Sequence, residues 1–266
     1  MAAARISRIL AVFAHPDDES LLCGGTFARL ADAGAEIVLL CGSRGECGSV
    51  SDPALVNGCD LGVVRVAELH AAAKVLGIAE VVALDHRDGD LRWRDVPEFH
   101  AEIVSAIERH RPDAVITFAE NGLYWHLDHI GVHERTFTAV KSLGDAAPPL
   151  YYVTMPTGLI GQVVKAARSK AEASNESSFW GLEPDAFGED EMAESSFTVD
   201  VRPWVRRKLA ALRCHRTQMG ASNPIAWIDE DDARQWLGLE YFRRSPLACC
   251  TPDRVLEDLA EPVTSS

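Results

Sequence analysis

The sequence predicts an α/β protein built on a Rossmann-like, doubly wound and mostly parallel sheet. Short, continuously apolar runs alternate with longer amphipathic segments, which is the pattern of strands and helices in such folds. The runs are apolar over most of their length, as expected for strands that helices cover on both faces. A polar cluster follows most of the runs, and in this class of sheet ligands bind at the carboxyl ends of the strands.

The elements can be placed from this alternation. The expected strands span residues 8–14, 36–41, 80–84, 114–118 and 150–154. The expected helices comprise one that ends at Gly34, three at residues 63–76, 99–110 and 130–143, and one that begins at Pro203. Glycine favours the C-terminus of a helix and proline favours its first turn, so these boundaries have a physical basis.

The whole chain, residues 1–266, is expected to form one domain with a C-terminal extension. Residues 1–154 would form the sheet core and residues 201–266 C-terminal helices. Between them, residues 155–200 are expected to be an acidic loop excursion. Its part from residue 171 onward contains nine acidic residues and no Lys or Arg, which is typical of an exposed segment and suggests a flap over the site.

Composition excludes several classes of protein. The formal net charge of -14 argues against a nucleic-acid or anionic-membrane surface, because such surfaces need clustered Lys and Arg. No apolar stretch is long enough to cross a bilayer, and the N-terminal residues lack the pattern of a signal peptide. The seven cysteines are odd in number and contain no C-x-x-C pair. We therefore expect a cytoplasmic protein with a small-molecule partner, and the sequence leaves homo-oligomerisation open.

The most chemically distinctive stretch is A-H-P-D-D-E at residues 14–19, directly after the first strand. His15 and Asp18 have an H-x-x-D spacing that suits two ligands of one metal ion. Asp17 between them is then free to act as a base. A short motif of this kind also arises by chance, and the alternative is a polar turn in which an aspartate caps the next helix.

A second motif, H-L-D-H at residues 126–129, follows the fourth strand. Both motifs belong to the same edge of the predicted sheet, which favours one shared site. His15, Asp18 and His129 would supply two imidazoles and a carboxylate. Three such ligands, with one position left open to water, are typical of a catalytic rather than a structural zinc site.

The remaining polar residues near these ligands suit the hydrolysis of an amide. Asp17 could take a proton from the attacking water, and His126 could protonate the leaving amine. Asp128 could hold the His126 ring and raise its pKa, and Tyr124 could donate to the oxyanion. The alternatives are a helix cap for His126 and Asp128 and a packing role for the tyrosine.

Together these motifs resemble the LmbE/PIG-L family of metal-dependent N-deacetylases. The resemblance adds S-R-G-E after the second strand, R-D-G-x-L at residues 87–91 and H-R-T-Q at residues 215–218. It covers residues 8–145 and the helix near residues 204–218. It implies that His15, Asp18 and His129 bind zinc or ferrous iron and that an N-acetylglucosamine-containing small molecule is the substrate. It also implies Asp17 as base, His126 as acid and Tyr124 at the oxyanion.

The resemblance further implies substrate contacts. Arg65 and Asp95 fall where the family's mycothiol-pathway member has its sugar-binding arginine and aspartate. Arg65 could bind sugar or phosphate oxygens, and Asp95 or Asp88 could accept hydrogen bonds from hydroxyls. The alternative for Arg65 is a helix-surface ion pair with Glu68.

Two positions depart from the family pattern. Leu127 replaces the usual proline, and Trp125 replaces a residue that is commonly glycine. The indole of Trp125 could stack on a sugar or on a larger aglycone.

Other functions remain to be weighed against deacetylation of an amino sugar. Within the same enzyme class, the amide could belong to a thiol conjugate or to an acylated antibiotic precursor. From another class, the polar edge could be the crevice of a Rossmann-type nucleotide-binding module. Against that module, the first turn lacks G-x-G-x-x-G and has only Gly24 and Gly25 downstream.

Overall fold

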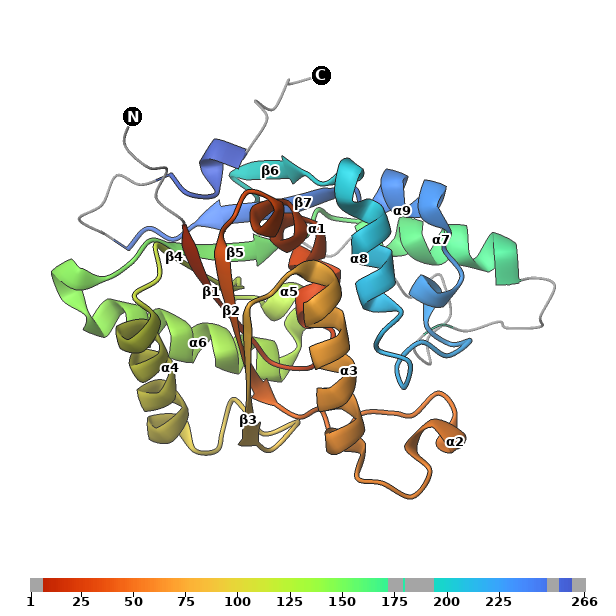
Figure 1. The fold of residues 1–266 in the computed structure, drawn as a ribbon, viewed down its shortest axis with the longest axis horizontal. Helices are drawn as coiled ribbons and strands as arrows, with labels where there is room; N and C mark the ends of the chain where they lie inside the picture. Colours follow the sequence, from red (N-terminus) through yellow and green to blue (C-terminus); the bar gives the residue numbers. More distant parts are fainter. Residues whose placement is uncertain (1–6, 172–178, 180–193, 248–253, 260–266) are drawn as a thin grey trace.

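A seven-stranded sheet organises the computed structural model, which describes residues 7–171, 179, 194–247 and 254–259 (Figure 1). The strand order is β3-β2-β1-β4-β5-β7-β6. The strands are β1 (Arg8–Phe13), β2 (Glu36–Ser43), β3 (Glu80–His86), β4 (Ala114–Phe118), β5 (Leu150–Thr154), β6 (Phe197–Asp200) and β7 (Leu239–Arg244). Strands β1 to β5 are parallel, and β7 runs antiparallel to both β5 and β6. The predicted Rossmann-like, mostly parallel sheet is confirmed.

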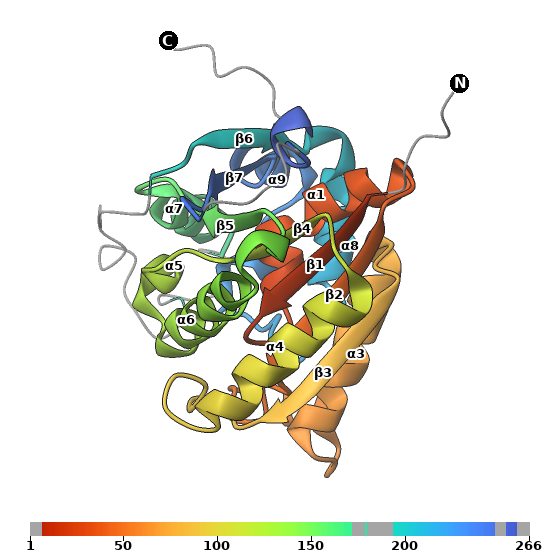
Figure 2. The same cartoon turned by 90° about the vertical axis from the view of Figure 1, so that its left-hand side faces the viewer.

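Helices cover both faces of this sheet. The helices of the N-terminal half are α1 (Asp18–Asp32), α2 (Pro53–Val56), α3 (Leu61–Leu76) and α4 (Val96–His110). The remaining α-helices are α5 (Gly122–Trp125), α6 (Leu127–Ser142), α7 (Leu159–Ala171), α8 (Val205–Leu212) and α9 (Glu230–Trp236). Helices α1, α3 and α8 pack together on one face, and α4 and α6 pack on the other (Figures 1 and 2). The sheet is therefore doubly wound, as the sequence predicts.

The central strands carry the hydrophobic core. The side chains of Ile9, Leu10 and Phe13 on β1 are fully buried, because helices cover both faces of the sheet there. Burial of aliphatic and aromatic side chains of this size contributes roughly 1.5–3 kcal/mol each. Phe13 meets Phe118 edge to face at the adjoining end of β4, with ring centroids 5.1 Å apart. The rigid ends of β1 and β4 thus lie next to each other.

The connections that leave these two neighbouring strands diverge. After β1 the chain enters α1 on one face of the sheet, and after β4 it enters α6 on the other face. Ligands of open α/β sheets bind at such a switch point, outside the carboxyl ends of the strands. Both sequence motifs start at this point.

The segment after β5 differs from the prediction. The expected loop excursion at residues 155–200 contains helix α7 and strand β6. Helix α7 has a buried face that includes Val163 and Val164, and this burial stabilises it. The acidic composition of the wider segment hides this apolar face in the sequence. Most of the acidic run, residues 172–178 and 180–193, lies outside the described residues, and with it most of the predicted flap.

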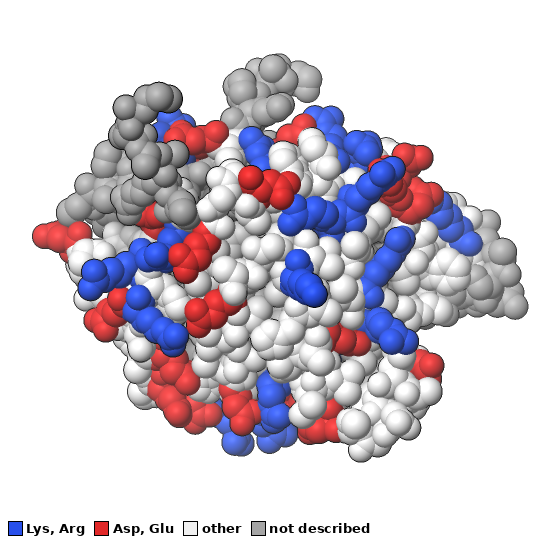
Figure 3. All heavy atoms as spheres, viewed as in Figure 1, with Lys and Arg blue, Asp and Glu red and all other residues white. Residues whose placement is uncertain are grey.

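The C-terminal part of the chain also differs, because residues 201–266 add a strand as well as helices. Strand β7 alternates between buried and more exposed residues, with Glu240 and Phe242 directed inward, so it pairs with β5 instead of continuing a helix. No helix among the described residues is both long and apolar enough to cross a membrane. On the face in Figure 3, Lys and Arg side chains are interspersed with Asp and Glu side chains.

Candidate functional site

The two sequence motifs meet at the carboxyl ends of β1 and β4. His15 stands two residues beyond β1, and Asp18 opens α1. His129 lies in the first turn of α6, which begins at Leu127 and not at residue 130 as the sequence suggests. His15, Asp18 and His129 are all buried, and their rings and carboxylate face one another.

Asp18 stands between the two imidazoles. Its Oδ1 lies 3.4 Å from His129 Nε2, and its Oδ2 lies 3.7 Å from His15 Nδ1. Tetrahedral ligands about 2.1 Å from a zinc ion are roughly 3.4 Å from one another, so each distance by itself is close to that of two ligands of one cation. The two distances end on different oxygens of Asp18, and this residue is not in either group of described residues whose ligand atoms all lie within 4.8 Å of one another. The ligand atoms of His15 and His129 also fall, with one from His126, in a group whose members lie within 4.8 Å of each other.

His129 has the ring state that a metal ligand needs. Its Nδ1 lies 3.2 Å from the carbonyl oxygen of Gly122, which fixes the proton on Nδ1 and leaves a lone pair on Nε2. This Nε2 is buried and has no hydrogen-bond partner among the described residues. Burial and then the charge on His15 hold the pKa of His129 well below its usual value. An unpaired buried nitrogen beside a carboxylate fits a bound cation.

Gly122 makes this arrangement possible. It has φ +58, and a Cβ there would lie 2.9 Å from an Ile130 side-chain atom and 3.0 Å from the Cβ of His129. Only glycine combines this backbone conformation with so close an approach to α6.

Among the described contacts the Asp128 carboxylate pairs with His15 and not with His126, which corrects the prediction from sequence. The carboxylate lies 3.0 Å from His15 Nε2 and accepts the backbone N–H groups of Gly89 and Leu91. The reason is geometric, because residues two apart at a helix start point to different sides. Asp128 instead contacts Nε2 of His15, the ring nitrogen that points away from Asp18. A carboxylate that holds the second nitrogen of a ligating histidine is common around zinc.

His126 also differs from the prediction in its charge. Burial and then the positive charge of His15 lower its pKa, and together they outweigh the predicted raising effect of Asp128. The backbone N–H of Asp128 donates to His126 Nδ1 over 3.3 Å, so the ring proton resides on Nε2. The ring of His126 stacks on that of His129 with centroids 4.4 Å apart, which places it beside the candidate ligands.

The loop that carries Tyr124 and Trp125 has an unusual backbone. Leu123 and Trp125 have φ of 70 and 64, a region that favours glycine. Glycine would adopt the conformation of residue 125 without strain, and Leu127, at the first position of α6, occupies a site where proline is well tolerated. Trp125 is 63% exposed at this rim.

Tyr124 lies next to the histidines. Its ring meets that of His129 edge to face at 5.4 Å and that of His126 at 5.9 Å. The residue is 49% exposed, but partial removal of its hydroxyl from water and then the negative charges of Asp18 and Asp17 raise the pKa of its phenol above the usual value. The phenol therefore stays protonated and is available as a hydrogen-bond donor.

Arg65 lies beneath Asp17 instead of facing the solvent. Its buried guanidinium donates to the carbonyl oxygens of Gly45 (2.9 Å) and Pro16 (2.6 Å) and to Asp17 Oδ2 (3.1 Å). These contacts occupy the two terminal nitrogens, which the sequence predicts to bind sugar oxygens, whereas the buried Nε has no hydrogen-bond partner among the described residues. The alternative pairing with Glu68 is absent from the described contacts as well, because that carboxylate binds Thr217.

Asp88 and Asp95, which the sequence predicts to contact the substrate, lie in different surroundings. Asp88 belongs to the buried cluster, with Oδ1 3.2 Å from His15 Nε2 and Oδ2 accepting the Cys47 N–H. His15, Asp88 and Asp128 form a second group with the spacing of metal ligands. Asp95 is half exposed at the start of α4, and its described ion-pair contact is with His86 at 3.9 Å.

Two contacts in this region escaped prediction from sequence. The R-D-G-x-L motif supplies backbone N–H groups to Asp128, and the H-R-T-Q motif supplies His215, whose Nε2 lies 2.8 Å from Glu19 Oε1. Both motifs were visible in the sequence. Their contacts were not, because they depend on which segments the fold brings together.

Without a bound cation, protonated His15 balances negative charge on the neighbouring carboxylates of Asp88 and Asp128. Burial lowers its pKa, but the hydrogen bonds to Asp128 and Asp88 outweigh this and raise the pKa to about 10. Burial, partly offset by His15, raises the pKa of Asp18 to about 7. A cation at this position would have to displace these protons before the side chains could act as ligands.

Metal affinity is therefore expected to rise with pH. From about pH 7.5 to 9, where the protonated form of His15 must lose one proton, the association constant should increase about tenfold per pH unit. Below about pH 7, Asp18 adds a second proton and the dependence should become steeper. Competition titrations of Zn²⁺ against a chelator of known affinity would measure this slope. An affinity that does not change with pH would contradict the assignment of these ligands.

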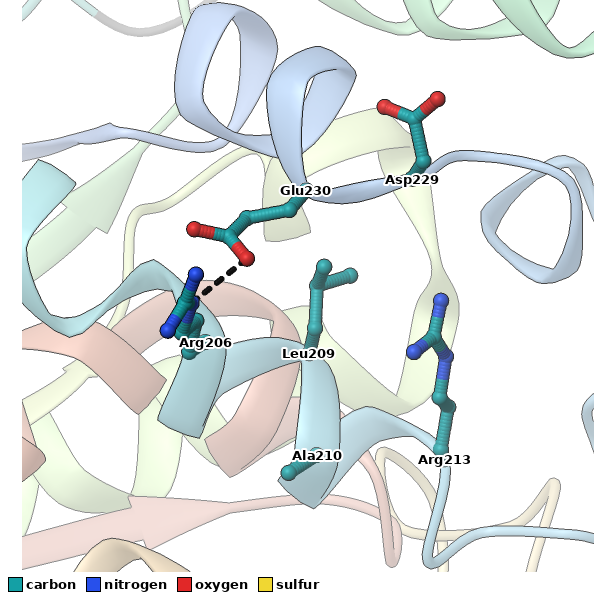
Figure 4. Close-up of a pocket in the computed structure, with 6 residues that line it drawn as sticks. All are labelled: Arg206, Leu209, Ala210, Arg213, Asp229 and Glu230. Atoms are coloured by element: carbon teal, nitrogen blue, oxygen red, sulfur yellow. Dashed lines mark hydrogen bonds and ion pairs between the residues drawn. The ribbon is translucent and has the colours of Figure 1, made fainter.

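A separate hollow lies between α8 and the start of α9 (Figure 4). Its lining residues are Arg206, Leu209, Ala210, Arg213, Asp229 and Glu230. The Arg206 Nε donates to Glu230 Oε2 over 2.6 Å across it. None of its residues belongs to the cluster at the sheet edge.

A cluster of candidate metal ligands with a neighbouring carboxylate, at the switch point of a doubly wound sheet, is typical of a metal-dependent enzyme. Within that class, the chain belongs to the PIG-L (GlcNAc-PI de-N-acetylase) family, whose profile matches residues 10–140. Enzymes of this family are metal-dependent deacetylases.

Individual relatives agree with this membership. Two proteins named 1D-myo-inositol 2-acetamido-2-deoxy-alpha-D-glucopyranoside deacetylase are similar over most of the chain. The one from Thermobispora bispora is 32% identical over 88% of this chain and 87% of its own length. The one from Geodermatophilus obscurus is 33% identical over 89% and 91%. A conserved protein of known structure from Thermus thermophilus superposes with a TM-score of 0.59 at 27% identity, over 90% of this chain and 94% of its own.

Proposed function

We propose that this chain is a zinc-dependent N-deacetylase that acts on a small molecule containing N-acetylglucosamine. The observation that carries the proposal is the cluster of His15, Asp18 and His129 with Asp17 beside it. The names of the relatives, deacetylases of an inositol-linked acetamido sugar, support this substrate class. Ferrous iron fits the same nitrogen and oxygen ligands and is the alternative metal.

A bound divalent cation would polarise the acetamide carbonyl and acidify a water molecule. Among the described contacts, the Asp17 carboxylate uses Oδ2 toward Arg65, which leaves Oδ1 for that water. Asp17 takes one proton from the water as it attacks the carbonyl carbon. The same proton passes to the nitrogen when the C–N bond breaks, and the second proton of the water is lost to solvent as the acetic acid ionises, so that acetate and the free amine leave.

Tyr124 and His126 assist this reaction by hydrogen bonding. The protonated phenol of Tyr124 donates to the oxygen that gains negative charge. His126, with its proton on Nε2, donates a hydrogen bond to the substrate beside the leaving amine, while Asp17 delivers the proton to the nitrogen. Trp125 offers an exposed ring at the rim, and Asp95 an exposed carboxylate, for contacts with the sugar or its aglycone.

The nucleotide-binding alternative is disfavoured by charge. The N-terminus of α1, where a Rossmann-type module binds the pyrophosphate of its ligand, carries Asp17, Asp18 and Glu19. Carboxylates at this position repel phosphate groups. We further propose a cytoplasmic setting, which is supported by the free state of the cysteines in the described residues, two of them exposed.

The proposal is tested by a substrate screen with protein depleted of metal and then reloaded with Zn²⁺ or Fe²⁺. N-acetylglucosamine, its inositol glycoside and N,N'-diacetylchitobiose would be offered, and free amine and acetate measured. We expect equimolar amine and acetate, with the highest kcat/KM for a glycoside rather than for the free sugar. Protein that holds about one equivalent of metal and releases no amine from any of them would refute the proposal.

A further inference from the structure

A buried ion pair lies directly under the proposed base. Glu19, in the first turn of α1, and His215, in the segment after α8, are 1% and 0% exposed. His215 Nε2 lies 2.8 Å from Glu19 Oε1, and the Ser20 hydroxyl donates to the same oxygen. The proposed function uses neither residue, yet both belong to motifs that the sequence singles out.

The second oxygen of Glu19 reaches Asp17. The backbone N–H of Asp17 donates to Glu19 Oε2 over 3.0 Å. Asp17 has φ 127 and ψ -24, a conformation that residues with a side chain rarely adopt. Such a conformation persists only where surrounding contacts impose it, and it is common in residues that take part in a reaction.

Arg65 holds the same residue from the other side. It binds the carbonyl oxygen of Pro16, which precedes the strained position, and the Asp17 carboxylate itself. The guanidinium is packed under Gly45 and Gly48, where added Cβ atoms would approach it to 2.3 Å and 2.6 Å. The peptide before Asp17 is therefore fixed at its N–H by Glu19 and at its C=O by Arg65.

The H-R-T-Q turn anchors this arrangement to the rest of the fold. Thr217, two residues after His215, donates through its backbone N–H and hydroxyl to Glu68 on α3. Gln218 donates to the carbonyl oxygen of Ser49, in the loop that follows β2. One turn thus links α1, α3 and the loop beside the site.

We propose that the buried Glu19–His215 pair is a positioning device. It holds Asp17 in its strained conformation, with the carboxylate directed toward the candidate metal ligands. This rests on the proposed role of Asp17 as base. Glu19 and His215 are positioning residues and touch neither substrate nor metal. A misplacement of about 1 Å in a reacting group commonly costs around 100-fold in rate, so loss of this support should be visible in kcat.

Replacing Glu19 by alanine removes the acceptor for the Asp17 N–H. We expect kcat to fall about 10- to 100-fold, while KM and metal content stay within about twofold of the wild-type values. Glu19→Gln keeps an oxygen for the Asp17 N–H and should restore kcat to within about threefold. A wild-type kcat in Glu19→Ala, or a loss in Glu19→Gln as large as in Glu19→Ala, would overturn the proposal.

The chain offers a matched control for lost stability. Glu240 forms another buried pair, 2.7 Å from Lys208, and accepts the N–H groups of Gly25 and Thr26 farther along the same helix α1. Glu240→Ala also leaves a buried cation unpaired but does not touch Asp17. It should lower the melting temperature and leave kcat unchanged. An equal loss of kcat in Glu240→Ala would show that general destabilisation, and not positioning, explains the effect.

Two further measurements test the proposal if Glu19→Ala does not fold or if no substrate is found. If Glu19→Ala does not fold, Glu19→Asp retains the charge but is too short to reach both His215 and Asp17, and an unchanged kcat in it would overturn the proposal. The crystal structure of a folded variant gives a readout independent of turnover. We expect Asp17 to leave its positive φ in Glu19→Ala, and an unaltered Asp17 would refute positioning even if no acetamide proved to be a substrate. Absence of turnover in the wild-type protein would refute only the proposed function.

Discussion

Replacing Asp17 by asparagine is expected to lower kcat about 10²- to 10⁴-fold, the range typical of a lost general base. Asparagine has nearly the same shape and tolerates positive φ, so the turn should persist. It cannot hold the proton that the attacking water must give up. Steady-state kinetics on the best substrate of the screen would measure the effect, together with metal content.

A control shows whether the loss is specific to this carboxylate. Asp60 also stands at a helix N-terminus, where its carboxylate accepts the Val63 N–H over 3.1 Å, but it is exposed and outside the cluster. Asp60→Asn should leave kcat and metal content unchanged. If Asp17→Asn kept turnover within a few-fold of wild type, the base would have to be another residue.

Replacing His129 by alanine is expected to abolish metal binding. Its Nε2 is the buried nitrogen without a hydrogen-bond partner beside Asp18, and alanine offers no ligand in its place. We expect the metal content to fall from about one equivalent to less than about a tenth, with loss of activity. Elemental analysis after gel filtration would measure the content directly.

His133 provides the matched control for this variant. It lies one turn farther along α6, and its Nδ1 likewise bonds to a backbone carbonyl, that of Phe118 at 2.9 Å. It does not belong to the groups with metal-ligand spacing. His133→Ala should retain the metal and the activity. Full metal content in His129→Ala would mean that the cation binds elsewhere, for which the group of His15, Asp88 and Asp128 is the first candidate.

Most of the sheet core could be predicted because its signals are local. The run at residues 114–118 is apolar apart from Thr117 and forms β4 with the same limits. Gly77 ends α3 in the left-handed conformation that glycine favours, as its place in the sequence indicates. Buried parallel strands and helix caps depend on neighbours in the chain, so the sequence displays them.

The C-terminal strands were not predicted because their partners are distant in sequence. Strand β7 inserts between β5 and β6, which come from before and after the acidic run. Its sequence, Leu239–Arg244, is short and contains three charged residues, so neither periodicity nor apolar character distinguishes it. The buried Glu240 among them makes sense only with Lys208, a residue on another element.

The candidate site shows the same division between local and distant contacts. Two patterns in the sequence predicted neighbours correctly, the H-x-x-D spacing of His15 and Asp18 and the pair of histidines after β4. The fold brings these side chains together. The assignment of Asp128 to His126 was wrong because it relied on nearness in sequence, whereas the fold pairs Asp128 with His15. The contacts of Arg65 with Asp17 depend in the same way on the packing of α3 against the turn after β1.

The central claim is that this cluster holds a divalent cation with which the protein hydrolyses an acetamide. Turnover of the best N-acetylated sugar in ¹⁸O-labelled water tests it most directly, with the metal-depleted and the reloaded protein side by side. We predict equimolar amine and acetate from the reloaded protein alone, with one labelled oxygen in each acetate. Equal turnover by the metal-depleted protein, or acetate without label, would contradict the claim.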